Sequence, residues 1–235
     1  MKYFLLVAMI FFPLRARAVG DQEYVILLHG LCRTSHSMDR MEEALAKSGY
    51  HVVNVDYPSR TASIERLSED AVGFAVSNCQ SQGAQKIHFV THSAGGILVR
   101  CYLSQHTIPN LGRTVMLGPP NHGSEMVDKF KSLWLFKQID GPAGGELGTD
   151  KDSMPYKLGG TKFCVGVIAG DCSMHWINSL LIPGHDDGMV SVECTKLDGM
   201  ADFIVVPATH TFIMRKDSVI RQTLAFLKTG RFEKK

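Results

Sequence analysis

A short stretch near the middle of the chain combines a serine with small residues in a pattern that suits nucleophilic chemistry. The segment reads Thr91-His92-Ser93-Ala94-Gly95-Gly96, and it joins an apolar run at residues 86–90 to an apolar helical pattern. The small residues after Ser93 would let the helix pass close to the strand and leave the serine on a tight turn with its hydroxyl outward. A serine held in this way can act as an acylating nucleophile, whereas a serine in an ordinary loop has no such role.

An acylating serine needs a base that accepts its proton and a carboxylate that orients this base. Of the ten histidines, His210 follows the last strand-like run and precedes the final helical pattern. It therefore falls at the carboxyl edge of a parallel sheet, as Ser93 does. The loop before that run contains two adjacent acids. We predict Asp187, which directly precedes a glycine, as the carboxylate, with Asp186 as the alternative.

Acyl transfer also needs hydrogen-bond donors for the oxyanion that develops in the transition state. The backbone N–H of Ala94, directly after the serine, is one candidate. The N–H of Leu31 is the second, because Gly30 ends the first apolar run and allows the backbone to turn toward the site. By itself, the neighbouring His29 is more typical of a structural histidine bonded within its loop.

The elements that must position these residues follow from the distribution of apolar residues. Continuous rather than alternating apolar runs are typical of strands buried on both faces of a parallel sheet. Such runs occur at residues 24–28, 52–55, 87–90, 114–117, 163–168 and 203–206. Because helical patterns separate several of them, we predict an α/β fold with a doubly wound, mostly parallel sheet flanked by helices.

The helical patterns carry their own start and stop signals. The pattern at residues 38–45 is expected to end at Gly49, and a longer one covers residues 64–78. The last helix is expected to be capped by Asp217 and to stop at Gly230.

The alternation of strands and helices breaks over residues 119–160, which we predict to be an irregular cap or insertion within a single domain. It contains one apolar patch, Leu133-Trp134-Leu135-Phe136. Long irregular insertions in compact domains are usually functional. The patch could line an acyl-chain pocket, form a lid or be a small helix packed on the sheet.

The first residues read as a targeting segment. Lys2 precedes an apolar run too short to span a bilayer, and Ala16-Arg17-Ala18 has a small-x-small cleavage pattern. We predict a signal peptide over residues 1–18 and one domain over residues 19–235, exported to the periplasm or secreted. A membrane anchor that is not cleaved is the alternative, because arginines are unusual so close to a cleavage site.

Charge and metal-ligand spacing exclude some classes of function. The formal net charge is +2, and Lys2, Arg15 and Arg17 belong to the predicted signal peptide, so the domain itself is nearly neutral. We therefore expect no nucleic-acid partner. No C-x-x-C or H-E-x-x-H spacing indicates a metal, and no cofactor is expected.

Six cysteines lie in the predicted domain, and an oxidising compartment would permit disulfides. We expect Cys101 and Cys164 to be buried thiols, because each falls in an apolar pattern. Cys172 and Cys194, in loop-like surroundings, are the candidates for a bridge.

Together these motifs resemble an α/β-hydrolase of the lipase/esterase type. The matching segments are His29-Gly30-Leu31, the stretch around Ser93, Leu117-Gly118-Pro119-Pro120-Asn121-His122-Gly123-Ser124, Asp187-Gly188-Met189-Val190 and His210. The order serine, acid, histidine is that of this family. The resemblance covers nearly all of the predicted domain, with one departure: Thr91 stands where the family most often has glycine.

The resemblance implies a role for each matching residue. Ser93 is the nucleophile, His210 the general base and acid, and Asp187 the orienting carboxylate, while Leu31 and Ala94 form the oxyanion hole. The histidine at position 122 is taken as structural. Secreted bacterial lipases of this kind often carry calcium, but its ligands do not map onto this chain residue by residue, so no metal is predicted.

The implied activity is hydrolysis of carboxylic esters through an acyl-enzyme on Ser93. The short apolar patch favours an esterase or small lipase acting on small-molecule or lipid esters, with transient contact with a membrane surface. Acyl transfer and amide hydrolysis by the same three residues are alternatives. A secreted binding protein that keeps the fold without turnover is the alternative from another class.

Overall fold

The computed structural model describes residues 22–130, 141–173 and 182–234. The predicted signal peptide and the apolar patch around Trp134 lie outside the described residues.

Each apolar run predicted as a strand forms one strand of a single sheet. The strands are β1 (Glu23–Leu28), β2 (His51–Val55), β3 (Lys86–His92), β4 (Leu111–Leu117), β5 (Val165–Gly170) and β6 (Asp202–Val206). Their order in the sheet is β2-β1-β3-β4-β5-β6, and every neighbouring pair is parallel. The carboxyl ends of the strands therefore meet at one edge, where the predicted site residues are expected.

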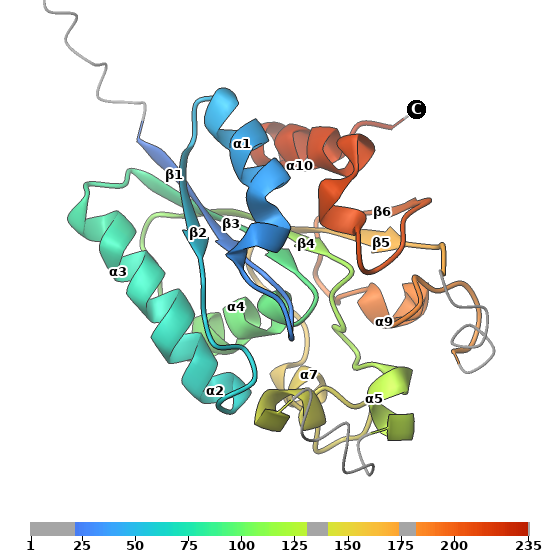
Figure 1. Cartoon of the computed structure of the whole chain (residues 1–235). Coiled ribbons are helices and arrows are strands. Elements are labelled where there is room, and N and C mark those ends of the chain that lie inside the picture. Colours follow the sequence, from blue (N-terminus) through green and yellow to red (C-terminus); the bar gives the residue numbers. More distant parts are fainter. Residues whose placement is uncertain (1–21, 131–140, 174–181, 235) are drawn as a thin grey trace, which may run out of the picture.

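Helices cover both faces of this sheet, which confirms the predicted doubly wound architecture. The α-helices are α1 (Asp39–Lys47), α2 (Ile64–Leu67), α3 (Phe74–Ser81), α4 (Ala94–Gln105), α5 (Glu125–Phe130), α7 (Met154–Leu158), α9 (Val192–Thr195) and α10 (Asp217–Thr229). The segments η1 (Ser35–Met38) and η3 (Ile213–Arg215) are 3₁₀ helices, and η2 (Ser68–Gly73) is a π-helix. Figure 1 shows α1 and α10 on one face and α2, α3 and α4 on the other.

The continuous apolar run of β1 arises because this inner strand is buried on both of its faces. In β1, Ile26 and Leu28 belong to the core under α2, α3 and α4, whereas Val25 and Leu27 belong to the core under α1 and α10. All four side chains are fully buried. Two hydrophobic cores on a common sheet fix the strands and so fix the loops at their ends.

The helix boundaries agree with the sequence in part. Gly49 and Gly230 follow α1 and α10 with φ of +95° and +80°, the left-handed conformation that often ends a helix. Asp217 is not the N-cap of α10 but its first residue, with Lys216 at the N-cap, and its carboxylate accepts a hydrogen bond from Arg40 Nη2 at 2.7 Å. The pattern at residues 64–78 forms α2 and α3 with the π-helical segment η2 between them.

The cysteines correct two expectations. Cys101 is a buried thiol as predicted, but Cys164 is exposed, because β5 begins only at the following residue. Cys172 and Cys194 form no bridge. The Sγ of Cys194 contacts Glu125 Oε1 at 3.2 Å, whereas Cys172 is exposed and contacts Asp171 at 3.6 Å.

Arg100 of α4 links two parts of the chain to the core of the domain: the loop after β4 and the region of α7. Its side chain is buried, and burial lowers the pKa of its guanidinium to about 10, so it stays charged at neutral pH. The guanidinium donates to Asn121 O and Oδ1 at 3.0 and 3.1 Å and to the carbonyl oxygens of Pro155 and Gly159 at 3.1 and 2.5 Å. A buried charge is tolerated when such partners replace water.

We expect Arg100→Met to lower the free energy of unfolding by roughly 2–4 kcal/mol, because several buried acceptors lose their donor. Chemical denaturation followed by circular dichroism measures the change. The matched control is Arg66→Met, since Arg66 is exposed and pairs with the exposed Asp70. The control should lower the free energy by about 0.5 kcal/mol or less. Equal losses in both variants would contradict a tying role for Arg100.

Candidate active site

Ser93 stands alone between a strand and a helix at the carboxyl edge of the sheet. β3 ends at His92 and α4 begins at Ala94, so Ser93 makes the whole turn. Its φ of 53° and ψ of −127° are rare for a residue with a side chain. Backbone strain of this kind persists only where surrounding structure imposes it, and it is concentrated at functional sites. The backbone N–H of Ser93 donates to Leu117 O of the neighbouring strand at 2.9 Å.

Two residues far apart in the sequence complete a chain of hydrogen bonds to Ser93. His210 Nε2 lies 2.9 Å from Ser93 Oγ, and His210 Nδ1 lies 2.7 Å from Asp187 Oδ2. Asp187 is buried, and Ser93 is half-buried, so its hydroxyl can be reached from outside. The structure thus brings together the three residues that the sequence predicts as nucleophile, base and carboxylate.

The structure distinguishes the two adjacent acids. The second oxygen of Asp187, Oδ1, accepts hydrogen bonds from the backbone N–H groups of Met189 and Val190 at 3.1 and 3.0 Å. Asp186 Oδ1 instead accepts from the N–H of Gly188 at 2.7 Å, which stabilises the turn. Asp187 therefore lies against the histidine, and Asp186 shapes the loop that holds it.

This arrangement determines where the protons lie on His210. A carboxylate can only accept, so the short contact with Asp187 requires a proton on Nδ1. In the neutral ring, Nε2 is then left with a lone pair that faces the hydroxyl of Ser93. The geometry is suited to removing the serine proton as the oxygen attacks an electrophile.

His92 is a residue of the site that the sequence analysis did not single out. Its Nε2 lies 3.0 Å from the backbone oxygen of His210, while the N–H of His210 donates to Asp187 O at 2.9 Å. Burial, together with the nearby His210 and Arg33, holds the pKa of His92 well below its usual range. The neutral ring can therefore donate through Nε2 and fix the backbone of the His210 loop.

The residue behind the contact between Asp187 and His210, at position 118, must be glycine. Gly118 follows β4 with φ of +55°, and a Cβ added to it would lie 3.0 Å from Asp187 Oδ2 and 3.3 Å from His210 Nδ1. Any side chain there would press on the two atoms that form the hydrogen bond. Local sequence offers no sign of this constraint, because it arises from the meeting of three separate loops.

The loop after β1 passes directly beside the serine. A Cβ on Gly30 would lie 3.0 Å from Ser93 Cβ, so only glycine permits this approach. Leu31 follows, and within the described structure neither its N–H nor that of Ala94 is used in a hydrogen bond. The next residue, Cys32, has φ of 56°, a second strained position at the site.

A cavity of about 210 Å³ opens beside Ser93 and His210. Much of its lining is apolar and comes from Leu31, Pro120, Val127, Leu147, Met189 and Val190. Part of the predicted insertion thus borders the site, since Val127 lies on α5 and Leu147 precedes α7. An apolar surface next to a nucleophile is suited to binding a hydrocarbon group.

The other two histidines of the motifs, His29 and His122, differ in their surroundings. His29 is fully buried, its Nδ1 contacts Gly30 O at 2.8 Å, and its ring stacks on Tyr57. The Tyr57 hydroxyl donates to His29 O at 2.6 Å. His122 is exposed, and its backbone N–H donates to Cys194 O at 2.9 Å.

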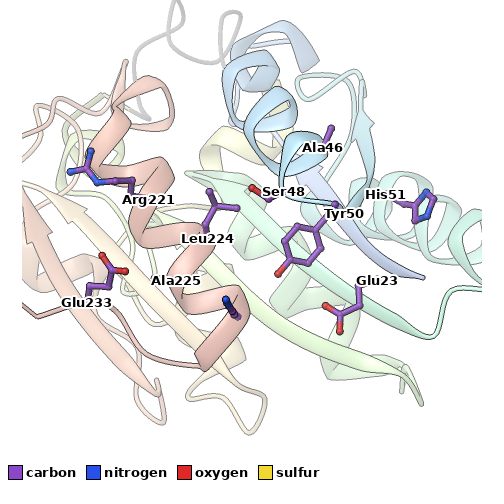
Figure 2. A pocket seen from close by; sticks show the side chains of 11 residues that line it. Glu23, Ala46, Ser48, Tyr50, His51, Arg221, Leu224, Ala225 and Glu233 are labelled. Carbon is purple, nitrogen blue, oxygen red and sulfur yellow. The ribbon is translucent and has the colours of Figure 1, made fainter. Parts of the chain in front are cut away.

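A larger cavity, about 1070 Å³, lies away from these residues. Figure 2 shows side chains that line it, among them Glu23 and His51, at the starts of β1 and β2, and Arg221 and Leu224 of α10. It is therefore at the amino edge of the sheet, opposite Ser93. In the described ranges, no cluster of three histidine, cysteine or acidic residues could hold a metal ion, and no helix is long and apolar enough to cross a membrane.

Comparison with known proteins identifies the family. A sequence model described as the alpha/beta hydrolase fold matches residues 23–146, more than half of the chain. The chain belongs to the α/β-hydrolase family. This confirms the resemblance that the motifs around Ser93 and Asp187 predict.

This α/β-hydrolase is similar in sequence to a thioesterase and similar in fold to lipases of known structure. The bovine (Bos taurus) lysosomal thioesterase PPT2 is 30% identical over 116 residues, which is 48% of this chain but only 38% of that protein. The mature Bacillus licheniformis lipase BlEst2 is similar in structure, with a TM-score of 0.73, 18% identity, and coverage of 88% of this chain and 93% of the lipase. Phospholipase PlaB from Legionella pneumophila has a TM-score of 0.68 and 17% identity, with coverage of 89% and 59%.

The two acids of the Asp187 loop can be separated by their effect on the reactivity of Ser93. We expect Asp187→Asn to slow covalent labelling by a fluorophosphonate at least about a hundredfold, because the amide no longer holds the proton on Nδ1 of His210. Asp186→Asn should slow labelling less than about tenfold. Thermal unfolding of both variants checks that they fold. A greater loss of labelling rate in Asp186→Asn than in Asp187→Asn would contradict the assignment of Asp187 as the carboxylate that orients His210.

Proposed function

We propose that this α/β-hydrolase cleaves carboxylic esters through an acyl-enzyme on Ser93. The observation that carries the proposal is the continuous hydrogen-bond chain from Ser93 Oγ through His210 to Asp187, at 2.9 and 2.7 Å. Its similarity to a lipase and a phospholipase extends to the fold alone, so the three residues and the cavity support the chemistry.

In the proposed acylation step, Ser93 Oγ attacks the carbonyl carbon of the ester and His210 Nε2 takes the hydroxyl proton. The carbonyl oxygen becomes negative and is stabilised by the N–H groups of Leu31 and Ala94. His210 then gives its proton to the departing alcohol oxygen as the ester bond breaks. Asp187 stabilises the imidazolium that exists between these two transfers.

Water completes the cycle by the same route in reverse. His210 removes a proton from the water, the resulting hydroxide attacks the acyl carbon, and the Ser93 oxygen leaves with the proton. The apolar side of the cavity, with Val127 and Leu147, holds the acyl chain during both steps.

Export through residues 1–18 stays a prediction of the sequence.

Replacement of the nucleophile tests this mechanism. Ser93→Ala should lower kcat for p-nitrophenyl octanoate about a thousandfold or more, because only the oxyanion donors and binding remain. The matched control is Ser81→Ala, since Ser81 is exposed and its hydroxyl donates to Asn78 O of its own helix. Full turnover by Ser93→Ala would contradict an acyl-enzyme on this residue, and absence of turnover in the natural protein would contradict ester hydrolysis.

Thioester hydrolysis is a second candidate, favoured by the 30% identity with the bovine lysosomal thioesterase over 116 residues. The same acyl-enzyme forms from either substrate, and the two differ only in the atom that leaves. We expect kcat/KM for p-nitrophenyl octanoate to equal or exceed that for its thiophenyl counterpart. A preference of more than about tenfold for the thioester, after correction for spontaneous hydrolysis, would favour a thioesterase instead.

A further inference from the structure

Arg33 lies where the cavity beside Ser93 meets a second cavity. It follows Leu31 and Cys32 in the loop after β1 and lines the active-site cavity with them. Arg33 also lines a cavity of about 520 Å³ with Asp56, Ser59, Arg60 and Thr61. Cys32 and Arg33 line both spaces, so the two cavities adjoin at these two residues.

The charge of Arg33 is not neutralised within the described part of the chain. Its side chain is half-buried, yet no ion pair and no hydrogen bond joins it to another residue of that part. Burial, and then the like charge of Arg215, lower the pKa of the guanidinium, while it remains a cation at neutral pH. A partly desolvated cation without an acidic partner gains more from an incoming anion than an exposed one does.

The two sides of the site differ in chemistry. Val127, Leu147 and Met189 give the active-site cavity an apolar side. The second cavity, beyond Arg33, is lined by hydroxyl and charged side chains, including Ser59 and Thr61. An ester has one end of each kind when a hydrocarbon acyl group is joined to a polar alcohol.

We propose that Arg33 binds an anionic group, a phosphate or a carboxylate, on the leaving-group side of the ester. This inference rests on the proposed hydrolysis at Ser93 and names the class of substrate for that site. A planar guanidinium can donate two parallel hydrogen bonds to either anion, which fixes the alcohol while the acyl chain fills the apolar side. Arg33 thereby determines specificity without taking part in proton transfer.

A matched pair of substrates isolates the anion. Octanoyl glycerol and octanoyl glycerol phosphate share the acyl ester and differ only in the phosphate on the alcohol. We expect the natural protein to favour the phosphate ester in kcat/KM by about tenfold or more, and Arg33→Gln to lose this preference mainly through KM. Arg33→Lys should retain part of it. Octanoyloxyacetate and its methyl ester form the corresponding carboxylate pair and identify which anion is preferred.

The control removes a positive charge elsewhere. Arg66→Gln changes the net charge equally, but Arg66 is exposed on α2 and pairs with Asp70. It should leave the preference at its natural value. Added salt should weaken the preference of the natural protein without affecting the neutral ester, because it screens the charge interaction.

Binding separates failure of this inference from failure of the proposed hydrolysis. The affinity of Ser93→Ala for each octanoyl ester can be measured calorimetrically, below the concentration at which the esters aggregate, and does not depend on turnover. Tighter binding of an anionic ester that Arg33→Gln abolishes in the same background supports the site. Equal affinity for anionic and neutral esters, or a preference that survives Arg33→Gln, overturns it even where the natural protein hydrolyses both.

Discussion

The hydrogen bond between His210 Nδ1 and Asp187 Oδ2 is the contact on which the arrangement of the site depends. It places a proton on one side of the imidazole ring and thereby leaves a lone pair toward Ser93 on the other. The surrounding structure serves this contact. His92 and the backbone of Asp187 bind the two backbone groups of His210, and Gly118 leaves room behind the paired atoms.

The sheet supplies the rigidity that this contact needs. Ser93, directly after β3, and Cys32, in the loop after β1, have strained backbone conformations. Strain of about 1–3 kcal/mol at each position can persist because two hydrophobic cores hold the strands from both faces. This strain lowers the stability of the domain. The same strained backbone fixes the orientation of the serine in the site.

In the proposed reaction, proton transfer and substrate selection depend on different residues at the carboxyl edge of the sheet. The serine, histidine and aspartate would perform the proton transfers for any acyl compound that reaches them. Under the proposed function, selection would depend instead on the loop after β1 and on the segment containing α5 and α7, which border the cavity. Loops on a rigid scaffold can vary without disturbing the catalytic contacts, which is consistent with low sequence identity between this chain and the lipases of similar fold.

The sequence by itself determined the strands, their parallel arrangement, and the positions of Ser93 and His210 at one edge of the sheet. These follow from local patterns, because apolar runs report burial and the order of elements restricts topology. The contact of Asp187 rather than Asp186 with His210, the support from His92 and the lack of an ion pair for Arg33 among the described residues were decided only by tertiary structure. Each depends on how loops from distant parts of the chain pack together, and no residue pattern within one loop encodes that contact. For the same reason the expected Cys172–Cys194 bridge was wrong: suitable surroundings in sequence do not bring two thiols together in space.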